Sequence, residues 1–120
     1  METSRHVLII DDEADICEML KEIFEYRGFS VSTAGNGFDA VAEAQKQAFL
    51  AALVDLRMPG MTGAETIIKL KEIQPDLRCI VISAHLNESV SEEAFNAGAS
   101  AVFAKPVNFN ELFKAVESAP

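Results

Sequence analysis

The sequence is poor in cysteine, and this limits the chemistry that it can support. Its two cysteines, Cys17 and Cys79, lie among apolar neighbours, and the chain has no C-x-x-C motif and no cluster of cysteine with histidine. Redox motifs and cysteine-based metal sites need such spacings. We therefore expect both thiols to be buried in the core.

Positive charge and long apolar runs are also scarce. Ten Lys and Arg stand against 19 Asp and Glu, a formal net charge of -9, and such a chain lacks the basic surface that nucleic-acid binding requires. The apolar run near the N-terminus is four residues long, too short for a signal peptide or a membrane span. We expect no direct contact with nucleic acid or membrane, and a cytoplasmic location.

The rest of the composition is that of one ordinary globular domain. Of the 120 residues, 49% are hydrophobic and 24% are charged, proportions that allow a sizeable core. We find no repeat, low-complexity tract or linker in the sequence. The prediction is a single domain over residues 1–120.

Short apolar runs alternate along the chain with longer segments of helical spacing. The runs predicted to be strands cover residues 7–10, 31–34, 50–54, 79–82 and 101–104. Buried strands that alternate with helices favour a parallel sheet covered on both faces. The predicted fold is α/β and doubly wound, a flavodoxin-like (βα)5 sheet with strand order 2-1-3-4-5, whose ligand site lies beyond the carboxyl ends of strands 1 and 3.

Helix signals fill the intervals between the strands. In the first helix, apolar residues from Ile16 to Phe24 recur at spacings of three and four, and Gly28 ends the segment. Asn36, Thr62 and Asn108 can cap three further helices. A short fourth helix is predicted over Glu88 to Ala97, before Gly98.

Charged and polar residues follow four of the predicted strands. They are Asp11 and Asp12, Asp55, Ser83 and Lys105. In a parallel sheet all of them meet at one edge, where two carboxylates 4 Å apart repel by about 4 kcal/mol at an effective dielectric near 20. The cluster therefore needs raised pKa values or a cation, and Mg²⁺ is the cation that best suits oxygen ligands beside a phosphoryl group.

This arrangement suits phosphoryl transfer, which depends on positioning and charge stabilisation. Lys105 would add a positive charge and the Ser83 hydroxyl a hydrogen-bond donor. Asp55 stands alone at the middle of the edge, so we expect it to be the nucleophile that forms an aspartyl phosphate. Taken singly, each of these residues could instead be a helix cap, a strand end or a solvated charge.

The motifs "IIDDE", "DLRMPGMTG", "ISAH" and "AKP", in this order, make the chain similar to the chemotaxis-type receiver domains of bacterial two-component response regulators. The resemblance covers essentially the whole chain. It implies that a sensor histidine kinase or a histidine phosphotransfer protein phosphorylates Asp55. It also implies that Asp12, Asp55 and the backbone carbonyl of Arg57 bind Mg²⁺, with Asp11 acting largely through water.

The same resemblance assigns roles around the phosphoryl group. Ser83 would engage it on activation, Lys105 would pair with it, and the peptide bond between Lys105 and Pro106 would be cis. Small Ala84 would leave the site open, whereas Arg57 and His85, two residues beyond Asp55 and Ser83, would flank the path of attacking water. Such a domain catalyses only its own phosphorylation and dephosphorylation.

The resemblance also locates an output surface, which has one departure from the family pattern. Helix 4, strand 5 and helix 5 form the usual output face and would serve an effector domain or a downstream protein. The aromatic residue often found three positions before the lysine is replaced by Val102, and Phe103 comes one step later. "GASAVFAKP" also lacks the acidic pair that supports dimers in one large subfamily of transcription factors.

Two alternative functions have different requirements. A pseudo-receiver, a binding module that is never phosphorylated, would usually lack one of the acids or the lysine. A phosphatase of the haloacid-dehalogenase type would need a second acid two residues after the nucleophile, where this chain has Arg57.

Overall fold

The computed structural model describes residues 5–117, which form five strands and five helices in strict alternation. The strands are β1 (His6–Ile10), β2 (Ser30–Ala34), β3 (Ala51–Val54), β4 (Arg78–Ser83) and β5 (Ala101–Ala104). The helices are α1 (Ala14–Tyr26), α2 (Gly37–Lys46), α3 (Gly63–Ile73), α4 (Glu88–Ala97) and α5 (Phe109–Glu117). Every predicted strand and helix is confirmed, and the predicted strand ends differ from the observed ones by at most one residue.

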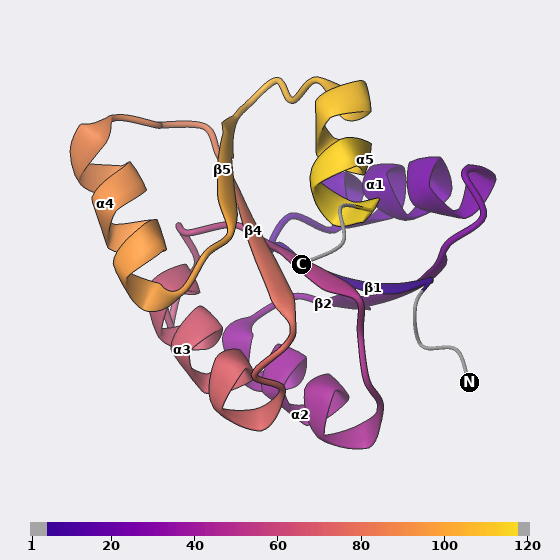
Figure 1. Cartoon of the computed structure of the whole chain (residues 1–120), viewed down its shortest axis with the longest axis horizontal. Coiled ribbons are helices and arrows are strands. Elements are labelled where there is room, and N and C mark those ends of the chain that lie inside the picture. The colour runs from indigo at the N-terminus through magenta and orange to yellow at the C-terminus, as the bar shows by residue number, and fades with distance from the viewer. Residues whose placement is uncertain (1–4, 118–120) are drawn as a thin grey trace.

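All strand pairs are parallel, and their order is β2-β1-β3-β4-β5 (Figure 1). The predicted fold class and strand order are confirmed. In this order β1 and β3 are neighbours, and their registered pair Ile10 and Val54 directly precedes Asp11 and Asp55. The register alone therefore brings these two aspartates to the same edge of the sheet.

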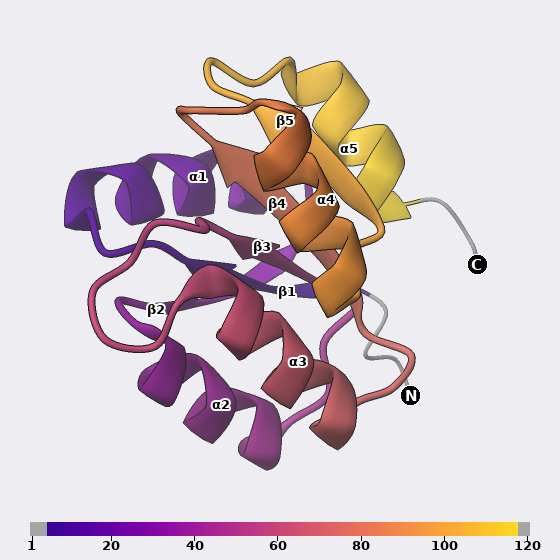
Figure 2. The same cartoon turned by 90° about the vertical axis from the view of Figure 1, so that its left-hand side faces the viewer.

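The helices cover both faces of the sheet and divide the core into two clusters. Figure 2 shows α2 and α3 on one side of the sheet and α1 and α5 on the other. On the α1 and α5 side, the fully buried Phe24 lies edge-on to Phe29 and against Phe113, with ring centroids 5.2 and 4.8 Å apart. Cys17 and Cys79 are both buried and free, as predicted.

Helix starts follow the capping signals of the sequence. Asn36 accepts a hydrogen bond from the backbone N–H of Asp39, and Asn108 accepts one from that of Glu111. Thr62 and Glu65 form a complete capping box at the start of α3. At the other end of a helix, Gly98 adopts φ 120°, a conformation that favours glycine, and ends α4. Of the helices in residues 5–117, none is long and apolar enough to cross a membrane.

Candidate functional site

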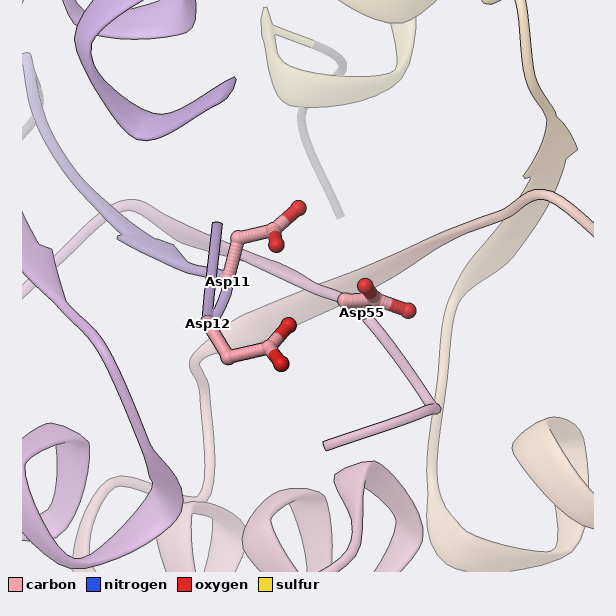
Figure 3. Close-up of side chains that lie close together, drawn as sticks. All are labelled: Asp11, Asp12 and Asp55. Carbon is pink, nitrogen blue, oxygen red and sulfur yellow. The ribbon is translucent and has the colours of Figure 1, made fainter. Parts of the chain in front are cut away.

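Three carboxylates gather at the carboxyl edge of the sheet. Asp11 and Asp12 follow β1, and Asp55 follows β3. Figure 3 shows the three side chains close together, and one oxygen of each lies within 4.8 Å of the others. The predicted convergence of these residues is therefore present.

Asp11 is the buried member of the cluster, with 4% of its surface exposed. Its Oδ1 accepts a hydrogen bond of 2.9 Å from the backbone N–H of Glu13, and its Oδ2 lies 3.6 Å from Lys105 Nζ. Burial raises the pKa of Asp11, and the negative charge of Asp55 adds to the rise, although the Glu13 N–H and Lys105 oppose it. The Glu13 N–H and Lys105 thus stabilise the charged carboxylate of Asp11, which burial disfavours.

Asp55 is fixed by contacts to both of its oxygens. Oδ1 accepts a hydrogen bond of 3.0 Å from the backbone N–H of Arg57, and Oδ2 lies 3.8 Å from Lys105 Nζ. The side chain is 11% exposed, so it is accessible from one side only. The Arg57 side chain is exposed.

Lys105 bridges the two carboxylates that are most buried. Its Nζ contacts Asp11 and Asp55, while its side chain remains 24% exposed. The backbone N–H of Lys105 donates to the carbonyl of Ser83 at 2.9 Å, which ties the end of β5 to β4. The peptide bond between Lys105 and Pro106 is cis.

Ser83 lies at the predicted edge, as the last residue of β4, but its hydroxyl faces the next loop. Its Oγ accepts a hydrogen bond of 3.2 Å from the backbone N–H of His85. Among residues 5–117, no hydrogen bond joins Ser83 to the carboxylates or to the Lys105 side chain. Ala84 and His85 are exposed in that loop.

Gly63 is a residue that the sequence analysis missed. Its N–H donates to the carbonyl of Leu56 at 3.2 Å, and a Cβ added to it would lie 2.5 Å from Leu56 Cα and 2.6 Å from the carbonyl oxygen of Asp55. Only glycine lets the first turn of α3 approach the backbone that carries Asp55. The available signal was a glycine directly after the capping Thr62.

The donor set of the cluster suits a hard divalent cation. Three carboxylate groups offer oxygen ligands within 4.8 Å of one another, and both Mg²⁺ and Ca²⁺ prefer oxygen. A cation would also offset the repulsion between these charges. The residues present therefore fit such an ion.

Comparison with known proteins identifies the family. The family model "Response regulator receiver domain" matches residues 7–117. The chain belongs to the response regulator receiver family. It is 32% identical over 111 residues to sporulation initiation phosphotransferase F of Bacillus subtilis. This match covers 92% of this chain and 90% of the relative.

The receiver also matches parts of longer proteins. It is 44% identical over 103 residues to a response regulator receiver protein of Anaeromyxobacter sp., covering 86% of this chain and 43% of the relative. It covers 26% of the transcriptional regulatory protein ZraR of Salmonella typhimurium, at 30% identity. The chain therefore spans less than half of these two relatives.

Solved receiver structures share the fold. A response regulator of Burkholderia pseudomallei, whose structure contains a phosphorylated aspartic acid, a calcium ion and citrate, superposes with a TM-score of 0.89 at 29% identity. The match covers 95% of this chain and 67% of that one. A phosphorylated aspartate and a bound metal ion thus occur together in a structural neighbour of this receiver.

Neutralising Asp11 will stabilise the receiver when no divalent cation is present. The pKa of Asp11 is higher in the folded than in the unfolded state. The stability of the wild type therefore falls as the pH rises from the unfolded-state pKa of about 4 through the folded-state pKa. At pH 7 Asp11→Asn will therefore be more stable than the wild type in urea unfolding with a chelator. The gain will shrink toward pH 4.

Asp15→Asn is the matched control, because exposed Asp15 lies in the first turn of α1. A negative charge there stabilises the helix, so this variant should lose a little stability. Equal gains in both variants at pH 7 would contradict the assignment to Asp11.

Adding a methyl group at Gly63 will disturb both the fold and the carboxylate site. In Gly63→Ala the loop of Asp55 must shift away from α3, and we expect divalent-cation affinity to fall about tenfold, with a loss of about 1–3 kcal/mol in stability. Calorimetric titration with Mg²⁺ and urea unfolding measure the two effects.

Two further glycines serve as controls for this experiment. Gly35→Ala meets no atom within 4 Å, whereas Gly37→Ala clashes with the side chains of Thr66 and Met61 rather than with the backbone of Asp55 or Leu56. Gly37→Ala should lose stability and keep its affinity for Mg²⁺. If it loses as much affinity as Gly63→Ala, the effect comes from instability alone.

Proposed function

We propose that this receiver accepts a phosphoryl group on Asp55 from the phosphohistidine of a sensor kinase or a histidine phosphotransfer protein. A carboxylate oxygen of Asp55 would attack phosphorus and form a P–O bond as the P–N bond to the imidazole breaks. The bonding electrons stay with the imidazole nitrogen, which then takes up a proton. The observation that carries the proposal is the position of Asp55, between two acids and Lys105.

Mg²⁺ is the proposed cofactor, held by Asp12, Asp55 and the backbone carbonyl of Arg57, with Asp11 supporting it through water. When bound, it would supply positive charge to the phosphoryl oxygens and to the carboxylates. Lys105 lies 3.8 Å from Asp55 and would pair with another phosphoryl oxygen. Its 3.6 Å contact with Asp11 orients the ammonium group.

Ser83 would have to move its side-chain oxygen to reach the phosphoryl group. Its Oγ now accepts from the His85 N–H at 3.2 Å, and a shift of this oxygen toward Asp55 would lengthen or break that hydrogen bond. The start of the loop between β4 and α4 is therefore coupled to the phosphorylation state. Ala84 would leave room for this movement, and the face of α4, β5 and α5 would carry the change to an effector domain or a downstream protein.

A pseudo-receiver that binds partners without phosphorylation is the alternative function. The chain keeps all three acids within 4.8 Å of one another and Lys105 in contact with Asp11 and Asp55, which favours the active receiver. Beyond its own phosphorylation and dephosphorylation we propose no enzymatic activity. We propose a cytoplasmic location, with protein partners rather than nucleic acid or membrane. The proposed domain spans residues 1–120.

Asp55 will be the one phosphorylated residue. With acetyl phosphate and Mg²⁺, intact-protein mass spectrometry should show the gain of one phosphoryl group, and Asp55→Asn should abolish it, because the amide is no nucleophile. Stable modification indicates a receiver, no modification a pseudo-receiver, and rapid turnover a phosphatase. Phosphorylation of Asp55→Asn at the wild-type rate would refute the choice of nucleophile.

Arg57 and His85 will lengthen the lifetime of the aspartyl phosphate. Both side chains are exposed beside the site and would hinder attacking water. Arg57→Ala and His85→Ala should each release phosphate faster, by about threefold or more, whereas exposed Lys69→Ala serves as a neutral control. Unchanged release in both site variants would remove this role.

Activation will move the loop after β4 without an aromatic switch in β5. Val102 packs against the core cluster of the α2–α4 side, and Phe103 against that of the α1 and α5 side, so strand alternation keeps Phe103 away from the Ser83 path. In structures with and without beryllofluoride, residues 84–90 should shift while the Phe103 rotamer stays. A flip of Phe103 with an unmoved loop would overturn this account.

A further inference from the structure

A cavity of about 460 Å³ lies beside the carboxylates, between α1, the start of α5 and the sheet. Its floor is formed by Ile9, Leu53 and Ile82, which belong to the core cluster that α1 and α5 cover. In the same core cluster, Phe24 of α1 packs against Phe113 of α5, with ring centroids 4.8 Å apart. Figure 1 shows the two helices on this same face of the sheet.

The walls of the cavity are almost entirely apolar. Ile16, Met19 and Leu20 line it from α1, and Val107 and Phe109 line it from the segment around the start of α5. Met19 is 45% exposed at its rim, and a methionine side chain adapts readily to the shape of a ligand. The volume falls within the range of small-molecule sites and is about three times that of an apolar cavity that binds benzene.

The charged groups at one end of the cavity already form ion pairs within the chain. Asp11, Asp55 and Lys105 form that end, and the ammonium group of Lys105 lies within 3.8 Å of both carboxylates. Across residues 5–117, no buried side-chain nitrogen or oxygen lacks a hydrogen-bond partner. A ligand with its own charge would compete with these pairs, whereas an apolar ligand would only replace water along apolar walls.

We propose that this cavity binds a compact, uncharged and largely apolar molecule about the size of a two-ring aromatic. The apolar walls that would hold the ligand carry no group of the proposed phosphoryl chemistry. The cavity adjoins that chemistry at its charged end, where Asp11, Asp55 and Lys105 line it. An occupant would therefore contact the segment that positions the lysine.

Indole is a suitable probe, and methyl NMR of the full chain is the direct test. Saturable ring-current shifts should concentrate on the methyl groups of Ile9, Leu53 and Ile82, with a dissociation constant of about 1 mM or lower. Indole-3-propionate, which adds a negative charge, should bind more weakly than indole, because the carboxylates of Asp11 and Asp55 would repel it.

Two matched surface variants locate the binding. Met19→Lys replaces an apolar wall residue with a charged one and should weaken indole binding about fivefold or more. Ile68→Lys introduces the same charge on α3, at a residue that is 46% exposed and does not line the cavity. This control variant should bind indole as the wild type does. Both variants should still be phosphorylated by acetyl phosphate, which separates this test from that of the proposed function. Scattered, unsaturable shifts, equal affinities in the two variants, or tighter binding of a charged probe would each overturn the proposal.

Discussion

Mutual repulsion among Asp11, Asp12 and Asp55 is the constraint on which the site depends. Within 4.8 Å of one another, these carboxylates stay together because the folded backbone holds them there. The β1–β3 register fixes two of them, and the backbone N–H groups of Glu13 and Arg57 each donate to one. Lys105 offsets part of the charge. The fold thus stores an unfavourable interaction that a cation or a phosphoryl group with its cation can relieve.

Much of this architecture could be predicted from the sequence because local signals agreed with the global pattern. Runs of four or five residues specified the strands, and side chains that cap helices specified where three of the helices begin. Once the strand order was inferred, the convergence of Asp11 and Asp55 followed from parallel topology alone. The site was predictable because its residues sit at the ends of regular elements.

Other features depend on atoms that no sequence pattern specifies. Glycine is required at position 63 because α3 approaches the Asp55 backbone closely. The sequence does not show this approach. The hydrogen bond from the His85 N–H to Ser83 Oγ depends on the rotamer of Ser83. The cavity depends on the spacing between α1 and the start of α5. These details set how the site is held and what surrounds it, rather than which residues form it.

The dependence of folding stability on Mg²⁺ tests the central claim most directly. In urea unfolding at pH 7, about 10 mM Mg²⁺ should stabilise the wild type, because a ligand that binds only the folded state raises the free energy of unfolding. Asp12→Asn removes the exposed acid and should lose most of that gain without losing the fold. A wild-type midpoint that Mg²⁺ leaves unchanged, or an equal gain in Asp12→Asn, would contradict the account.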